Sequence, residues 1–252
     1  MSRKKGKRKE NEEKPHYGYY ALTIFLGLAA IILVAGAAGY VFVSRVIGII
    51  IAGFGLYLLA TYIISLYWLN QSESFDFTNV LQFRGDEQVL DVGCGLGKVT
   101  VGAAKQLKEG TVTGIDIWNT VEIPGNSPEI AYRNAEIEGV RDRVEFKSGD
   151  VLNLEFGDNT FDVVTSSSVL NNLPGDEKKL KALREIYRVL KPGGIFFLLE
   201  PLRDVRGFII FSPLAFWQLQ TREKWIALLK KTGFVNLQYQ YKGAGYFTVE
   251  KL

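Results

Sequence analysis

Val89-Leu90-Asp91-Val92-Gly93-Cys94-Gly95-Leu96-Gly97 is the stretch of this 252-residue chain that decides its fold. It joins a short apolar strand to a glycine-rich turn, and the residues that follow predict a helix over 97–107. Glycine is used where the backbone must approach a ligand closely or take a positive φ, because a Cβ would block either. The dinucleotide-binding pattern G-x-G-x-x-G requires its third glycine at the position that Lys98 occupies. The stretch therefore predicts a ligand-binding turn, and it disfavours a nicotinamide cofactor.

Segments that alternate between strand and helix follow this turn. The predicted elements are strands at 111–116, 143–150 and 161–166, and helices at 127–138, 176–190 and 221–231. Ser127 as N-cap and Pro128 at the first helical position mark the start of the helix at 127–138. Such alternation predicts an α/β fold with a mostly parallel sheet and helices on both faces.

These motifs, taken in order, resemble those of the class I S-adenosylmethionine-dependent methyltransferases, in particular the UbiE-like type 11 group. The resemblance extends from about Phe83 to the C-terminus, roughly two thirds of the chain. It implies a seven-stranded, mostly parallel, Rossmann-like sheet that ends in an antiparallel hairpin over 233–239 and 246–250. It also implies S-adenosylmethionine as cofactor and S-adenosylhomocysteine as product.

The resemblance also implies roles for residues around the cofactor. In that family an acid at the position of Asp116 accepts hydrogen bonds from both ribose hydroxyls, and an acid at Asp150 recognises the adenine amino group. Each has a plainer alternative, because Asp116 can cap a turn and Asp150 can start a helix. The full set implied to contact the cofactor is Asp91, Gly93, Cys94, Gly95, Gly97, Asp116, Ile117, Trp118, Asn126, Asp150, Val151, Ser166 and Ser167.

Two residues of that set have competing interpretations. Trp118 lies in the segment 117–126, which is longer than usual for the family, and it either covers the adenine and ribose or packs under its own loop. Cys94 is expected to be a small buried loop residue rather than a nucleophile, because no histidine lies near it in sequence.

Asn171 and Asn172 are candidate residues of the substrate pocket. Related small-molecule enzymes often have histidine at one of these positions, and a histidine can take a proton at neutral pH. Asparagine cannot act as a base, so either the substrate nucleophile needs no deprotonation or a group outside this motif removes the proton. The alternative is that both asparagines cap the next helix or shape the loop. No catalytic residue is assigned.

The segment 202–220 is unusually apolar for a connection after the fifth strand. Class I enzymes commonly build the cover over the methyl acceptor here, which makes Phe208, Phe211 and Trp217 candidates for the substrate pocket. Lying in the headgroup region of a bilayer and packing on the sheet are the other two interpretations of this segment.

Two uncharged runs precede the α/β domain, which is expected over 85–252. If His16 is neutral, 16–44 and 46–72 carry no charge, and each exceeds the roughly 20 residues that span a bilayer core. The predicted organisation is a basic head at 1–16, a transmembrane helical hairpin at 17–70 with helices near 19–43 and 46–69, and a linker with a lead-in helix at 71–84. The α/β domain is expected to bind its cofactor without residues 1–70.

Charge distribution predicts the orientation of this hairpin. The chain carries +3, of which the head contributes +4 from seven basic and three acidic residues, so the remainder is close to neutral. Positive charge stays in the cytoplasm, and two spans return the chain to the same side. The N-terminus and the catalytic domain are therefore expected in the cytoplasm, and the lipid bilayer is an expected partner. A nucleic acid partner is not expected, because no basic stripe lies outside the head.

Small residues at Ala35, Gly39, Gly48 and Ala52 allow close approach of helix backbones, either within the hairpin or in a homo-oligomer. A metal site is not expected, because no cluster of ligand residues has the required spacing.

The sequence therefore predicts a membrane-anchored methyltransferase that acts on an apolar or lipid-like small molecule. A non-catalytic membrane sensor or scaffold that binds S-adenosylmethionine is one alternative. A methyltransferase of membrane-proximal proteins is another.

Overall fold

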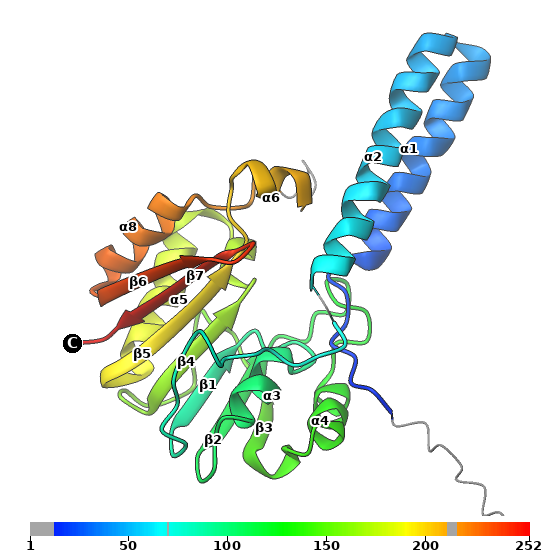
Figure 1. Cartoon of the computed structure of the whole chain (residues 1–252). Helices are drawn as coiled ribbons and strands as arrows, with labels where there is room; N and C mark the ends of the chain where they lie inside the picture. The colour runs from blue at the N-terminus through cyan, green and yellow to red at the C-terminus, as the bar shows by residue number, and fades with distance from the viewer. Residues whose placement is uncertain (1–12, 70, 211–215) are drawn as a thin grey trace, which may run out of the picture.

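The computed structural model describes residues 13–69, 71–210 and 216–252, which form a helical hairpin and an α/β unit (Figure 1). The hairpin consists of α1 (Leu22–Phe42) and α2 (Arg45–Leu69) and projects away from the α/β unit. The strands of the α/β unit are β1 (Gln88–Val92), β2 (Thr111–Asp116), β3 (Val144–Ser148), β4 (Phe161–Ser167), β5 (Leu190–Glu200), β6 (Val235–Tyr241) and β7 (Gly245–Glu250). Its helices are α3 (Lys98–Ala104), α4 (Pro128–Ile137), α5 (Gly175–Val189), α6 (Val205–Ile210) and α8 (Arg222–Thr232), with short 3₁₀ turns η1 (Arg141–Arg143) and η2 (Leu170–Asn172).

The strands form one seven-stranded sheet in the order β3-β2-β1-β4-β5-β7-β6. Strands β1 to β5 are parallel, whereas β7 runs antiparallel to both β5 and β6. This confirms the predicted mostly parallel α/β sheet with its closing antiparallel hairpin. Val89, Leu90 and Val92 of the central strand are at most 1% exposed, because a parallel strand covered on both faces is apolar on both sides.

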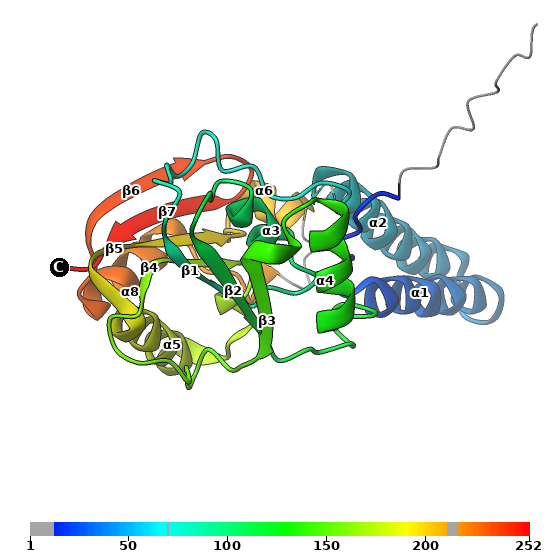
Figure 2. The ribbon, with the colours of Figure 1, turned by 90° about the horizontal axis from the view of Figure 1, so that it is seen from below.

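Helices cover both faces of the sheet (Figure 2). Helices α5 and α8 bury Leu183, Ile186 and Trp225 in one apolar core, and α3 and α4 bury Val101 and Ala131 in the other. The apolar residues of α5 recur three or four positions apart, which places them on the single helix face that packs on the sheet. The sheet is thereby held rigid, and its carboxyl edge remains for ligand binding.

Local residues mark where α4 and α8 begin and end, and Ser127 and Pro128 lie at the start of α4 as the sequence predicts. Ser127 accepts a hydrogen bond from the Ile130 amide at 3.4 Å, and Pro128 is the first residue of α4. Thr221 caps α8 in the same way, and Gly233 ends α8 with a φ of +110°. The observed helix bounds differ from the predicted ones by up to three residues, which is the difference at the start of α1 and at the end of α3.

The segment 71–84 differs from its predicted lead-in helix, because it forms turns and irregular backbone. Asp76 accepts hydrogen bonds from both the amide and the hydroxyl of Thr78, a local side-chain turn that competes with helix formation. The Phe75 amide also donates to the Lys98 carbonyl at 3.0 Å. An extended path thereby lets Phe75 and Phe77 pack separately against the core beside α3.

Small residues bring α1 and α2 together. A Cβ added at Gly36 would lie 2.6 Å from the Ala52 backbone, and one at Gly48 would lie 2.3 Å from the backbone of Tyr40. The small residues therefore serve packing within the hairpin, one of the two uses that the sequence left open.

Both hairpin helices are long and apolar enough to cross a membrane, by length and composition. In an apolar 18-residue stretch of each helix, only 17% of α1 and 28% of α2 is buried inside the structure. Large apolar side chains such as Ile31 and Val34 are about two thirds exposed. A helix in the core of a soluble protein is mostly buried, and these two helices are candidate membrane spans.

Candidate functional site

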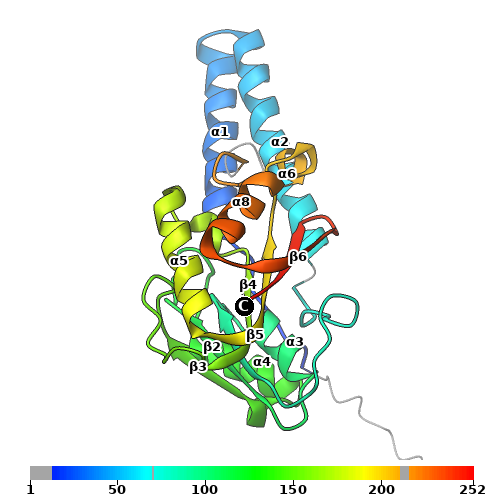
Figure 3. The same ribbon diagram turned by 90° about the vertical axis from the view of Figure 1, so that its left-hand side faces the viewer.

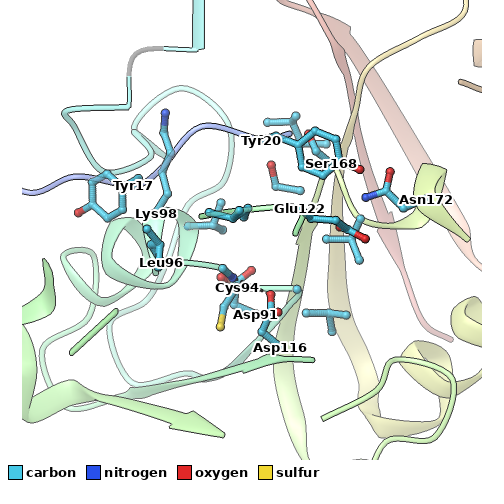
Figure 4. Close-up of a pocket in the computed structure, with 18 of the residues that line it drawn as sticks. Tyr17, Tyr20, Asp91, Cys94, Leu96, Lys98, Asp116, Glu122, Ser168 and Asn172 are labelled. Atoms are coloured by element: carbon cyan, nitrogen blue, oxygen red, sulfur yellow. Dashed lines mark hydrogen bonds between the residues drawn. The ribbon is translucent and has the colours of Figure 1, made fainter. Parts of the chain in front are cut away.

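A cavity of about 470 Å³ lies at the carboxyl ends of β1, β2 and β4 (Figure 4). Open α/β sheets bind ligands at this edge, beside the point where strand order reverses. Here the reversal falls between β1 and β4. The cavity is walled by the β1–α3 turn, the loops after β2, β3 and β4, the turn between β6 and β7, and the segment that precedes α1.

The glycine turn forms the floor of this cavity. Gly93 and Gly95 line it with φ values of +69° and +50°. A Cβ at Gly93 would lie 2.2 Å from Val169, so a larger residue does not fit. Gly97 has φ +89° and precedes α3, but it lies outside the cavity wall, because it packs against the Phe146 ring. Gly97 therefore shapes the turn instead of lining the cavity.

Asp91 and Cys94 are buried beneath the turn. The Asp91 carboxylate accepts hydrogen bonds from the hydroxyls of Thr100 at 2.6 Å and Thr165 at 2.8 Å. Burial raises the pKa of Asp91 to about 6, against the lowering effect of both hydroxyls. Burial also raises the pKa of the Cys94 thiol, which disfavours the thiolate and agrees with a packing role.

Asp116 combines a turn cap with a place in the cavity wall. Its Oδ2 accepts the Gly95 amide at 2.8 Å, and its Oδ1 accepts the Trp118 amide at 2.7 Å and Asn126 Nδ2 at 3.1 Å. Asn126 also lines the cavity, and its buried Oδ1 has no hydrogen-bond partner within the described part of the chain. Two polar side chains with unused acceptor capacity therefore face the cavity together.

The remaining residues of the β2 loop divide between the cavity and the core. Ile117 lines the cavity, whereas Trp118 does not, and its ring packs against the core formed by α3 and α4. The backbone at Trp118 has φ +56°, which turns its side chain toward that core. Of the two interpretations of Trp118, packing under the loop agrees with the structure. Asp150 and Val151, which follow β3, line the cavity, and Asp150 Oδ1 accepts the Leu152 amide at 2.8 Å.

The loop after β4 separates residues that were predicted as a group. Ser167 and Asn172 line the cavity, whereas Ser166 is fully buried beneath it. Asn171 does not line the cavity, because its Nδ2 donates to the Pro201 carbonyl at 2.9 Å and its Oδ1 accepts the Gln220 amide at 3.1 Å. The structure corrects Asn171 from a pocket residue to one that shapes the loop.

Glu200, at the end of β5, holds this loop in place. One oxygen of its buried carboxylate accepts the amides of Val169 at 3.0 Å and Leu170 at 2.7 Å. Burial raises the pKa of Glu200 to about 8, although these amide donors act in the opposite direction. No role for Glu200 was predicted from the sequence, because its hydrogen-bond partners lie about 30 residues away.

The residues immediately before α1 form the roof of the cavity. We call residues 16–21 the strap, and Tyr17, Gly18 and Tyr20 of the strap line the cavity (Figure 4). Buried Asn134 of α4 fastens the strap, since its side chain accepts the His16 amide at 3.0 Å and donates to the His16 carbonyl at 2.9 Å.

Other hydrogen bonds fasten the strap at both of its ends. The Tyr17 amide donates to the Gln71 carbonyl at 2.9 Å, and the Ala21 amide donates to the Glu122 carbonyl at 2.5 Å. No local sequence pattern distinguishes a tyrosine that lines a cavity from one that lies at a membrane interface, so the role of these tyrosines could not be predicted.

Two of the candidate acceptor residues lie elsewhere. Phe208 and Trp217 do not line the cavity, and Phe211 lies outside the described residues. Helix α6, which carries Phe208, contacts α2 near the base of the hairpin (Figures 1 and 3). Trp217 is 75% exposed. These two aromatic residues are therefore corrected from pocket residues to residues on the surface beside the hairpin.

The residues present fit S-adenosylmethionine. The glycine turn admits close backbone approach, the Asp116 carboxylate and the unpaired Asn126 Oδ1 can accept hydroxyl donors, and Asp150 lies one strand further along the sheet. This geometry and the sheet order define a class I S-adenosylmethionine-dependent methyltransferase domain.

Comparison with known proteins agrees with this class. A family model described as a methyltransferase domain matches residues 90–198. A demethylmenaquinone methyltransferase of Symbiobacterium thermophilum is 34% identical over 57% of this chain and 54% of its own length. A sterol 24-C-methyltransferase of Aspergillus fumigatus is 38% identical over 45% of this chain and 27% of its own.

Among solved structures, a methyltransferase from Methanosarcina mazei has the same fold, with a TM-score of 0.52 and 23% identity over 68% of this chain and 95% of its own. The chain spans about half the length of the curated relatives it matches. The α/β unit is therefore a methyltransferase domain similar to those of S-adenosylmethionine-dependent enzymes, matched by the family model over residues 90–198, and its cofactor is S-adenosylmethionine.

Proposed function

We propose that this protein is a membrane-anchored enzyme that transfers a methyl group from S-adenosylmethionine to an apolar, lipid-like small molecule. The observation that carries the proposal is the joint lining of one cavity by the glycine turn and by residues at both ends of the hairpin. Tyr20 lies two residues before α1, and Gln71 lies two residues after α2. If the hairpin spans a bilayer, the cavity lies at the membrane surface, where a lipid-like molecule is concentrated.

The surface beside the hairpin supports an apolar acceptor. Val205 and Phe208 of α6 and nearby Trp217 are between 42% and 77% exposed, and α6 contacts α2. Aromatic and aliphatic side chains in this position are typical of segments that lie in the headgroup region. Two of the relatives carry names that specify a quinone and a sterol as acceptors.

The chain's own residues account for binding and orientation. When bound, S-adenosylmethionine supplies a methyl group on a positively charged sulfur, which is already activated for displacement. The glycine turn and Asp91 are positioned to hold the methionine end, Asp116 and Asn126 the ribose, and Asp150 with Val151 the adenine. The strap closes the cavity from above and excludes water. Holding nucleophile and methyl group in line can contribute about 7–11 kcal/mol to catalysis.

The test of this function uses the full chain in lipid vesicles with methyl-labelled S-adenosylmethionine and reduced demethylmenaquinone. We expect label in the quinone fraction and formation of S-adenosylhomocysteine. Cofactor binding without turnover on quinone, sterol or total lipid extract would favour the sensor alternative. Label that appears only in membrane proteins would favour a protein methyltransferase.

Membrane attachment has its own test. We expect the full chain to stay with membranes through carbonate extraction, with reporters at the N-terminus and at position 73 on the cytoplasmic side and position 45 on the other side. Release by carbonate would show a peripheral protein and would remove the bilayer from the proposal.

A further inference from the structure

A polar cluster on the roof of the cavity consists of residues that have no assigned role in cofactor binding. It consists of Tyr20 from the strap, Glu122 from the loop after β2, and Asn172 from the loop after β4, and all three line the cavity (Figure 4). These segments meet only in the folded chain. Ser168 beside them belongs to the loop that follows β4 and also lines the cavity.

Backbone and side-chain contacts hold each member of the cluster in place. Tyr62 of α2 donates its hydroxyl to the Tyr20 carbonyl at 3.1 Å, and the next strap residue, Ala21, donates its amide to the Glu122 carbonyl. Asn119 Nδ2 donates to Glu122 Oε1 at 3.0 Å. The Asn172 side chain lies beside the Tyr20 phenol (Figure 4).

Glu122 differs from the other carboxylates of the cavity wall, which are those of Asp91, Asp116 and Asp150. Asp91 is engaged by two hydroxyls beneath the glycine turn, and Asp116 by three donors of the surrounding loops. Asp150 caps the turn that begins at Leu152. Glu122 is the carboxylate that stands beside Tyr20 and Asn172, opposite the floor of the cavity.

A transfer to a hydroxyl-bearing acceptor requires a group that takes a proton. Asn172 cannot do so, and the one histidine of the chain, His16, accepts the Gly18 amide through Nδ1 at 2.8 Å and lies outside the cavity wall. Burial and the Glu122 charge raise the pKa of Tyr20 to about 12, so its phenol stays protonated and acts as a donor. Within this cluster, the Glu122 carboxylate is therefore the group that can accept the proton of the acceptor hydroxyl.

We propose that Glu122 is the general base for a phenol- or quinol-type acceptor and that Tyr20 positions the acceptor hydroxyl beside it. In this step the acceptor O–H bond breaks and its proton goes to the Glu122 carboxylate. The released electron pair, on oxygen or delocalised to the ring carbon, forms the bond to the methyl carbon. Where the ring carbon is methylated, its C–H bond then breaks, the proton goes to water, the electron pair restores the aromatic ring, and the oxygen takes a proton from water. The methyl–sulfur bond breaks, and its electron pair remains on sulfur. The products are the methylated acceptor, S-adenosylhomocysteine and protonated Glu122, which returns its proton to water.

This inference rests on the proposed function, because it needs a small-molecule acceptor with an ionisable hydroxyl. The other titratable groups in the cavity wall, whose charge affects a pH profile, are Tyr17, Tyr20, Asp91, Cys94, Lys98, Asp116, Asp150, Lys242 and Tyr246. Burial lowers the pKa of Lys98 to about 8, against the effect of Glu73. Lys98 is therefore expected to add a change in the pH–rate profile near pH 8. Replacing Glu122 would leave that change in place.

The experiment compares Glu122→Gln and Tyr20→Phe in the full chain with Glu129→Gln and Tyr19→Phe. Both control positions are outside the cavity wall on neighbouring parts of the same segments. With reduced demethylmenaquinone as acceptor, Glu122→Gln is expected to lower kcat by about 10²–10⁴-fold, the range for a general base. Tyr20→Phe is expected to raise the acceptor KM by about tenfold, the scale of one hydrogen bond. S-adenosylhomocysteine affinity and melting temperature are expected to stay at the wild-type values in all four variants.

A second readout does not depend on turnover. In the presence of S-adenosylhomocysteine, wild-type protein is expected to shift the absorbance of added 1-naphthol toward the naphtholate form at neutral pH. Glu122→Gln is expected to lose this shift, and Glu122→Asp to retain part of it.

The outcomes separate the two proposals. A wild-type chain that methylates no lipid-like acceptor would overturn the proposed function. An active wild type whose Glu122→Gln variant keeps its kcat and the naphthol shift would overturn the role of Glu122 alone. Loss of S-adenosylhomocysteine binding in Glu122→Gln would place Glu122 on the cofactor instead and would equally reject it as the base.

Discussion

Replacing Asn134 with alanine is expected to loosen the strap and thereby weaken cofactor binding. The Asn134 side chain makes three hydrogen bonds, to the amide and carbonyl of His16 and to the Leu96 carbonyl, at 2.9–3.0 Å. Two of these bonds join the strap, and a typical intramolecular hydrogen bond contributes about 0.5–1.5 kcal/mol net, so the variant loses about 1–3 kcal/mol of the interactions that dock the strap. The contacts of Tyr17 and Ala21 remain and keep the strap partly docked.

A partly docked strap reduces the population of chains with a complete cavity, and apparent affinity falls in proportion to that population. We expect the dissociation constant for S-adenosylhomocysteine to rise by about tenfold, equivalent to about 1.4 kcal/mol. Calorimetry measures the constant, and hydrogen exchange of a peptide spanning 13–21 reports strap opening directly. The control is Asn79→Ala, because Asn79 is exposed in the segment 71–84. Unchanged exchange of 13–21 together with unchanged affinity would refute the role given to Asn134.

Three further changes test the cavity and the loop after β4. Gly95→Val is expected to abolish S-adenosylhomocysteine binding with circular dichroism unchanged, because Gly95 has φ +50° and its Cβ would lie 3.2 Å from Ile123; calorimetric binding at micromolar ligand would contradict the placement of the cofactor. Asp116→Ala is expected to weaken binding by about 1.5–3 kcal/mol, the scale for hydrogen bonds to a charged group, and an unchanged constant would show that Asp116 does not hold the ribose. Glu200 has a pKa raised from 4.5 to about 8, so the folded state binds more protons than the unfolded state and stability is expected to fall as pH rises through this interval. Thermal melts at pH 6 and pH 8 are expected to show that slope in the wild type and a smaller one in Glu200→Gln, and equal slopes would contradict it.

The parts of the site that follow from local sequence were predictable. The glycine turn, the acids that follow β2 and β3 and the cap Ser127 depend on residues within a few positions of each other, and the structure places them at the turn, in the cavity wall and at the start of α4. The seven-stranded sheet followed from a family resemblance carried by the same local motifs.

The parts that depend on distant contacts were not predictable. Asn134 and His16 are 118 positions apart, and nothing local to either residue indicates that they pair. Asn171 and Asn172 are adjacent residues of the same type. Asn171 hydrogen-bonds to the backbone after β5 and before α8, whereas Asn172 lines the cavity. The aromatic residues of the segment 71–84 suggested a helix. A turn forms there instead, because the Asp76 side chain accepts the Thr78 amide.

The strap changes how the hairpin relates to the enzyme unit. A chain that begins after α2 lacks Tyr17, Gly18 and Tyr20, which form the roof of the cavity. The expectation that the α/β unit binds its cofactor without residues 1–70 therefore conflicts with the geometry.

The bond between the Ala21 amide and the Glu122 carbonyl lies one residue before α1, and it joins the hairpin to the same loop that supplies Asn126 to Asp116. A tilt of α1 relative to the α/β unit acts on this loop first, because α1 begins immediately beyond that bond. If the hairpin spans a bilayer, its attachment sets the position of the strap, and the strap sets the shape of the cavity. Membrane attachment and cofactor binding are then coupled through the same hydrogen bonds, which is a physical reason for placing a methyltransferase for lipid-like acceptors directly at the end of a membrane hairpin.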